Sequence, residues 1–142
     1  MSNTEIRNKK NSHKKKFHIS QKDKISREMY LKSIYLLLDK KGKIKAIDLS
    51  NYLKIKKSSV SEMLKKLILE KYITINNHFI KLTKKGEKEA KNVLRKYLIV
   101  KDFLINVLKI SPEKAEQEAC ELEHGFSDES IAKLNIFLKT IK

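Results

Sequence analysis

The sequence has one cysteine, no tryptophan, one proline and three glycines among its 142 residues. A single cysteine cannot form an internal disulfide, which fits a reducing compartment. So few prolines and glycines argue against a turn-rich β protein. No apolar stretch is long enough to span a membrane or to serve as a signal peptide, so we expect a cytoplasmic protein without a membrane partner.

Enzyme signatures are also lacking. The chain has no glycine-rich phosphate loop and no nucleophile–base pair, and two of its four histidines, His13 and His18, lie near the start. Apolar residues still make up 40% of the sequence, which is enough for a packed core. We therefore expect a folded binding protein, not an enzyme.

Positive charge is abundant and unevenly distributed. The formal net charge is +16, of which residues 1–22 carry +6, residues 23–96 carry +12 and residues 97–142 carry −2. A lysine-rich genome alone does not predict this asymmetry. The asymmetry indicates one part that binds a polyanion and a second part with another task. We interpret residues 1–22 as a flexible basic tail, whose Lys14–Lys16 run could contact phosphates or stay solvated.

The middle of the chain has the pattern of a winged helix-turn-helix. Helical periodicity predicts helices over residues 26–39, 45–53 and 57–70. The apolar period then changes to 2, which predicts a β-hairpin over residues 72–82 with a tight turn at Asn76-Asn77, since Asn tolerates positive φ. Three helices followed by a two-stranded ribbon predict a DNA-binding domain over residues 23–96.

The outward face of the third helix and the ribbon tip predict the DNA contacts. Ser58 and Ser59, at a helix N-terminus that favours an anion, can approach a phosphate or a base edge. The lysines neutralise phosphates, which gives affinity without sequence recognition. The predicted DNA-binding residues are Lys56, Lys57, Ser58, Ser59, Ser61, Glu62, Lys65, Lys66, Asn76, Asn77 and His78.

The last third of the chain predicts a helical domain over residues 97–142. A long helix is expected over residues 84–109, a second from Pro112 to about His124, and a last one capped by Ser127. About 45 residues make a thin core on their own, so the apolar stripes of these helices predict a homodimer interface. The predicted fold class is mainly α, a winged helix-turn-helix followed by a helical dimerisation domain.

Cys120, Glu123 and His124 are spaced i, i+3 and i+4, so they share one face of the predicted helix. A thiolate, a carboxylate and an imidazole together can bind a divalent transition metal. A lone cysteine is more often a small buried hydrophobe, however, and a histidine at a helix end often only contacts the last carbonyls. The spacing alone leaves both interpretations open.

Segments spread over residues 26–140 share residues with a known family. They are Glu28-Met29-Tyr30-Leu31, Ile34-Tyr35, Ser58-Ser59-Val60-Ser61, Leu82-Thr83, Gly86 and Glu118-Ala119-Cys120-Glu121-Leu122-Glu123-His124. Together they resemble the diphtheria toxin repressor family of metal-dependent regulators, in the short form without the SH3-like domain. The resemblance implies a transcriptional repressor of metal-homeostasis genes that binds a palindromic operator as a homodimer.

In that family a metal bridges the first helix to the dimerisation domain. The resemblance implies Met29, Cys120, Glu123 and His124 as the principal ligands. Soft sulfur donors favour Fe(II), with Mn(II) or another divalent metal able to substitute. The manganese branch of the family has carboxylates at the positions of Met29 and Cys120. It has a third carboxylate at the position of Lys32, whose positive charge in this chain would repel a second metal.

The chain departs from the family at the ancillary site. Tyr97 and Lys101 stand where the family has a histidine and a glutamate, and both are poor ligands at neutral pH, whereas Glu116 keeps a carboxylate. We expect no second metal there. Our hypothesis is that the Lys101 ammonium substitutes for that cation and neutralises Glu116 or a neighbouring acid.

The resemblance implies corepression, in which the metal fixes the angle between each DNA-binding domain and the dimer core. Three alternatives stay open: a manganese-responsive regulator, a metal-independent winged-helix regulator with a vestigial site, and a metal-buffering or RNA-binding protein. The response of DNA affinity to a change at Cys120 distinguishes the second of these. Low preference for any duplex sequence would favour the third.

Overall fold

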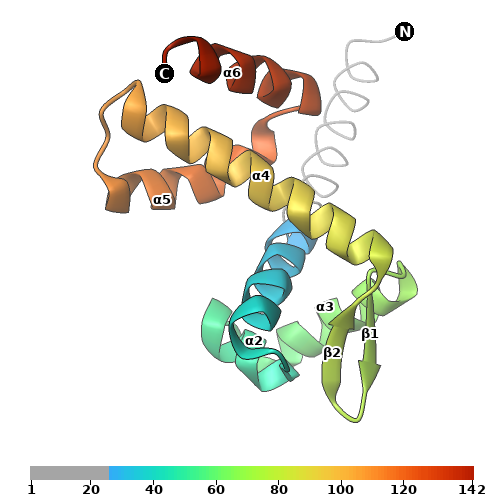
Figure 1. The fold of residues 1–142 in the computed structure, drawn as a ribbon. Coiled ribbons are helices and arrows are strands. Elements are labelled where there is room, and N and C mark those ends of the chain that lie inside the picture. Colours follow the sequence, from blue (N-terminus) through green and yellow to red (C-terminus); the bar gives the residue numbers. More distant parts are fainter. Residues whose placement is uncertain (1–25) are drawn as a thin grey trace, which may run out of the picture.

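A computed structural model describes residues 26–142 of the chain (Figure 1), and the predicted basic tail lies outside them. A helix over residues 26–41 comes first. It is followed by α2 (Ala46–Leu53), α3 (Lys57–Leu69), β1 (Ile73–Asn76), β2 (Phe79–Leu82), α4 (Lys84–Asn106), α5 (Pro112–Leu122), the 3₁₀ turn η1 (Glu123–Gly125) and α6 (Asp128–Thr140). The predicted order of helices and hairpin is confirmed.

The first described helix, α2, α3 and the hairpin surround one apolar core. Leu31 and Ile34 of the first helix are fully buried there together with Val60 and Leu67 of α3. Strand β2 is tied to the segment before α2, because the amide of Ile80 donates a hydrogen bond of 2.9 Å to the carbonyl oxygen of Ile44. Helix α3, whose outward face is predicted to contact DNA and which we call the recognition helix, shares this core with the first helix.

The hairpin turn lies one residue later than the sequence predicted. Asn76 pairs with Phe79, so the loop residues are Asn77 and His78. Both have positive φ, 50° and 69°. This two-residue loop of positive φ matches the twist of the strands, and His78 adopts the conformation that was expected of Asn76.

Helix α4 joins the hairpin to the C-terminal helices (Figure 1). The hydroxyl of Thr83 caps it by accepting a hydrogen bond of 3.1 Å from the amide of Gly86. A Cβ on Gly86 would lie 2.0 Å from the carbonyl oxygen of Tyr72, so only glycine allows this approach. The helix is continuous across residues 96 and 97, where the sequence suggested a domain boundary, and it ends at Asn106, earlier than the expected residue 109.

Helices α4, α5 and α6 share a second core, in which Val100, Ala119 and Ile131 are buried. Helix α5 begins at Pro112 as predicted, but its α-helical part ends at Leu122. The residues that follow form η1, a tighter turn of the kind common at helix ends. None of the helices within residues 26–142 is both long and apolar enough to cross a membrane.

Candidate functional site

Charged side chains join the first described helix to α5 and η1. Glu28 and Lys32 lie one turn apart on the first helix, and both are buried. Nδ1 of His124 lies 2.6 Å from Oε2 of Glu28. The ammonium of Lys32 donates to Oε1 of Glu123 at 2.9 Å and lies 3.7 Å from Sγ of Cys120. These five residues, which we call the junction cluster, link the DNA-binding part to the C-terminal helices.

His124 is held between two carboxylates. Glu28 contacts its Nδ1, and Nε2 lies 3.4 Å from Oε1 of Glu123. A carboxylate on one ring nitrogen fixes the orientation of an imidazole and leaves the other nitrogen for a ligand, which is how proteins commonly prepare a metal-binding histidine. The position of Glu28 therefore suits His124 to bind a metal through Nε2.

Among the described residues, one carboxylate oxygen of Glu123 has a hydrogen-bond partner and the other has none. Its side chain is fully buried, and Oε2 has no hydrogen-bond partner among the described residues. Burial raises the pKa of Glu123, while the adjacent Lys32 ammonium acts in the opposite direction. A buried carboxylate oxygen that lacks a partner is costly, and a cation would relieve that cost.

The donor types in the junction cluster fit a divalent metal, but their arrangement surrounds an ammonium. Within residues 26–142, no three histidine, cysteine, aspartate or glutamate side chains are grouped as a formed metal site. Lys32 contacts both Cys120 and Glu123 instead. Met29 is half-buried and packs against the N-terminal core. The predicted set of four ligands stays a prediction.

The three residues of the predicted ancillary site also lie near one another. The ammonium of Lys101 is 3.0 Å from Oε1 of Glu116 and 5.9 Å from the ring centre of Tyr97. The hydrogen bond to Glu116 raises the pKa of Lys101, and burial raises the pKa of Tyr97. The ring of Tyr97 also lies 4.6 Å from the ammonium of Lys32, so two cations flank it.

Sequence reasoning did not assign Glu28 and Lys32 to the site. The available signal was their i, i+4 spacing on a helix whose neighbouring residues are apolar. Charged side chains on the buried side of a helix require a polar or oppositely charged partner. The sequence pattern does not show that these partners lie in η1. The α-helical spacing assumed for Glu123 and His124 was also wrong, because both residues belong to η1.

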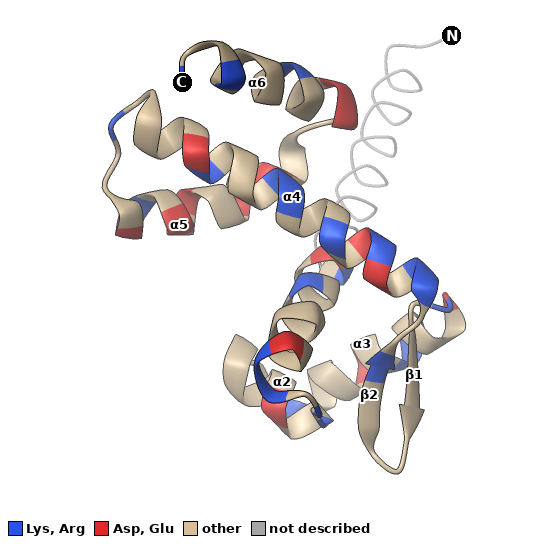
Figure 2. Ribbon diagram, viewed as in Figure 1, with Lys and Arg blue, Asp and Glu red and all other residues tan. Residues whose placement is uncertain are grey.

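The predicted DNA-binding residues all lie on the surface. All eleven are exposed, eight of them at or just before the start of α3 and along it, and three at the hairpin tip. Figure 2 shows Lys and Arg on these elements and on the first half of α4, whereas the charged residues of α5 are mostly Glu. The charge asymmetry seen in the sequence is therefore also a separation in space.

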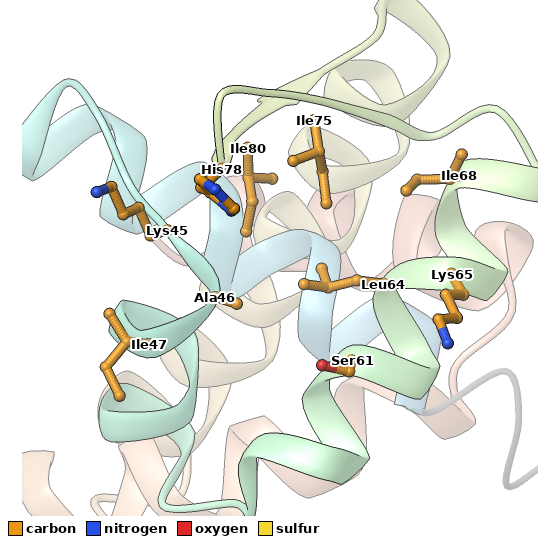
Figure 3. Close-up of a pocket in the computed structure, with 10 residues that line it drawn as sticks. All are labelled: Lys45, Ala46, Ile47, Ser61, Leu64, Lys65, Ile68, Ile75, His78 and Ile80. Atoms are coloured by element: carbon orange, nitrogen blue, oxygen red, sulfur yellow. The ribbon is translucent and has the colours of Figure 1, made fainter.

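An apolar cavity opens beside the recognition helix. Its volume is about 420 Å³, and it lies between α3, the start of α2 and the hairpin (Figure 3). Leu64 and Ile80 line it, and the predicted DNA contacts Ser61, Lys65 and His78 border it. The polar side chains expected to meet DNA therefore stand at the edge of an apolar surface.

Two parts of the chain match models of one protein family. Residues 25–78 match the N-terminal DNA binding domain of the iron dependent repressors, and residues 83–142 match their metal binding and dimerisation domain. The chain belongs to the iron-dependent repressor family. The resemblance noted in the sequence is thereby confirmed, and a family of transcriptional regulators, not of enzymes, accounts for the fold.

Two similar proteins give the scale of similarity. An uncharacterized HTH-type transcriptional regulator of Methanocaldococcus jannaschii is 40% identical over 117 residues, 81% of this chain and 94% of that protein. The regulator MntR of Bacillus subtilis is 29% identical over 110 residues, 77% of each chain.

Solved structures agree with this assignment. The manganese regulator SloR matches with a TM-score of 0.72 at 35% identity, and T. acidophilum IdeR with a TM-score of 0.69 at 31% identity. These matches cover 80% and 75% of this chain but 53% and 51% of those structures. The chain therefore spans about half the length of these two solved structures.

Proposed function

We propose that this iron-dependent repressor family member is a transcriptional repressor of metal-homeostasis genes, with a divalent metal as corepressor. One observation carries the proposal: the junction cluster brings metal-donor side chains of α5 and η1 against the helix that supports the recognition helix. A change at this cluster would therefore be felt by the DNA-binding surface. A role on DNA agrees with the cytoplasmic localisation expected from the sequence.

The residues that would hold the metal are Cys120 through its thiolate, Glu123 through Oε2 and His124 through Nε2, with Met29 supplied by the first helix. A bound metal would supply a doubly charged link between these side chains and stabilise one orientation of the two parts. Glu28 would keep the imidazole in place by its contact with Nδ1.

The link to DNA runs through the first described helix. Leu31 and Ile34 pack in the same core as Val60 of α3, so the two helices move together. Fixing the first helix against α5 and η1 would fix the direction of α3. In a homodimer, two α3 helices must be placed to match the half-sites of a palindrome.

We expect the homodimer to form through the C-terminal helices. Leu98 of α4 and Ile136 and Phe137 of α6 expose 53%, 63% and 46% of their surface in the isolated chain. Apolar surface of this extent on the matched dimerisation domain supports a partner of the same kind. A homodimer would also present two copies of the basic face to one duplex.

The sulfur donors at Met29 and Cys120 favour Fe(II) over Mn(II), because Mn(II) prefers oxygen ligands. Among the relatives, SloR is described as a manganese regulator, so manganese remains the principal alternative. A metal-independent regulator is the second alternative, since ion pairs already join the two parts.

The deciding experiment is binding to a promoter-like duplex library with Fe(II) under anaerobic conditions, with Mn(II), and with a chelator. Selective binding that needs metal supports corepression and ranks the two metals. Equal selective binding in chelator contradicts the metal switch and favours the metal-independent alternative. Binding without preference for any duplex sequence contradicts the regulatory role and favours a metal-buffering or RNA-binding protein.

A further inference from the structure

Lys32 lies where a cation would be bound. It is only 8% exposed, although a lysine normally keeps its ammonium in water. The ammonium is 2.9 Å from Oε1 of Glu123, 3.7 Å from Sγ of Cys120 and 4.6 Å from the ring centre of Tyr97. A carboxylate, a sulfur and an aromatic face are all groups that attract positive charge.

Two of these three groups are also the donors predicted for the metal. A divalent ion on Cys120 and Glu123 would share its ligands with a buried ammonium only a few ångströms away. Two cations at such a distance repel each other, and more strongly beside the buried Glu123 than in bulk water. The four-carbon side chain of Lys32 is flexible, so its ammonium can withdraw when a metal binds, but this withdrawal has a cost.

We propose that the Lys32 ammonium is the resident cation of the junction cluster and competes with a divalent metal for Cys120 and Glu123, so that it sets the metal concentration at which the regulator responds. This inference rests on the proposed metal dependence. In the absence of metal, Lys32 pairs with Oε1 of Glu123 and holds the first helix against η1. The metal therefore replaces an existing link between the two parts and does not enter an empty gap.

A purely structural role for Lys32 makes a different prediction. If Lys32 only ties the helices together, its removal should loosen the protein and leave metal binding unchanged or weaker, since the ligands would lose their support. If Lys32 competes, its removal should tighten metal binding even though one ion pair is lost. The sign of the change in metal affinity separates the two roles.

The test is direct titration of the full chain with Co(II), whose thiolate absorption also reports whether Cys120 is a ligand. The variants are Lys32→Gln, which removes the charge and keeps a polar side chain, and Lys32→Arg, which keeps the charge. The matched control is Lys133→Gln, because Lys133 of α6 also pairs with a glutamate, Glu129, but both side chains are exposed. Thermal unfolding of each metal-free variant shows whether it is folded.

We expect Lys32→Gln to bind Co(II) about tenfold more tightly than the unaltered chain, or better, and to show the thiolate band at lower metal concentration. Lys32→Arg and Lys133→Gln should stay within about threefold of the unaltered chain. If Lys32→Gln does not fold without metal, Lys32→Met, which keeps the apolar stem, is titrated instead with the same expectation.

The outcomes distinguish this inference from the proposed function. If the unaltered chain binds Co(II) and Lys32→Gln binds it equally or more weakly, the competition is wrong and the proposed metal-dependent regulator stands. If Lys32→Gln binds Co(II) and the unaltered chain does not, the competition is supported and metal dependence of the unaltered chain is overturned. No binding by the unaltered chain, Lys32→Gln or Lys32→Met would overturn both.

Discussion

The carboxylate of Glu28 lies 2.6 Å from Nδ1 of His124, although 96 positions of the chain separate the two residues. This contact joins the helix that supports the recognition helix to the turn that carries the predicted metal ligands. Both side chains are buried, so the pair depends on close approach of the two parts of the protein.

Replacing Glu28 by glutamine should lower metal affinity about 10-fold to 100-fold, because the carboxylate orients the imidazole of His124 and increases its basicity. Titration with Co(II) measures the effect. Glu87→Gln is a suitable control, since Glu87 is an exposed residue of α4 that pairs with Lys91. Equal affinities for the two variants would contradict the orienting role.

Replacing Cys120 by glutamate should shift metal preference from Fe(II) toward Mn(II), because an oxygen donor replaces a sulfur donor. Replacing it by alanine should abolish the dependence of DNA binding on metal. The ratio of duplex affinities with each metal and with chelator measures both effects. Cys120 is exposed, so its loss should leave thermal stability nearly unchanged. Unaltered DNA binding by the alanine variant would instead favour a vestigial site.

Replacing Lys101 by glutamate should raise the number of metal ions bound per chain. The change removes the ammonium that lies 3.0 Å from Glu116 and places a carboxylate beside it. Metal content after equilibrium dialysis measures the stoichiometry. Lys101→Gln removes the same charge without adding a ligand and should keep the original number. An unchanged stoichiometry in the glutamate variant would count against Lys101 as a substitute for a cation.

Replacing Lys65 by glutamine should weaken binding to all duplexes alike. The slope of log affinity against log salt concentration should fall by about 1, the value expected for the loss of one phosphate contact. Binding measured over a range of salt concentrations tests this. Lys114→Gln on the acidic helix α5 is the control and should leave the slope unchanged. A loss confined to particular sequences would instead make Lys65 a base-reading residue.

Replacing Gly86 by alanine should destabilise the protein by about 1–3 kcal/mol, because the new methyl group would collide with the backbone of Tyr72. The carbonyl oxygen of Tyr72 cannot turn aside without disturbing the hairpin. Denaturant unfolding measures the loss, with Gly125→Ala as the control because open space surrounds that position. Equal stability of the two variants would contradict the close approach of α4 to the hairpin.

Local patterns in the sequence were enough to predict the order of helices and strands. The apolar stripe that includes Val60 and Leu64 predicted the buried face of α3, and both residues are buried. Ser127 was identified as a cap, and its hydroxyl accepts a hydrogen bond from the amide of Ser130. Each of these features depends on residues a few positions apart, which periodicity and capping rules can detect.

The junction cluster could be predicted only in part. Spacing and the family resemblance pointed to Cys120, Glu123 and His124, but their partners Glu28 and Lys32 lie 88 to 96 positions away in the chain. No local rule pairs residues at that separation. The family resemblance implied only that a cation at Lys32 would repel a second metal, and the fold shows that its ammonium contacts two of the expected ligands.

The continuity of α4 has a mechanical consequence. Its 23 residues make a rod about 34 Å long, anchored to the hairpin at Gly86 and to α5 and α6 at the other end. Such a rod acts as a lever, since a tilt of about 5° at one end displaces the other by about 3 Å. That displacement is comparable to the spacing of adjacent base pairs, so under the proposed corepression a small tilt of α4 would change the register of the hairpin and α3 on DNA.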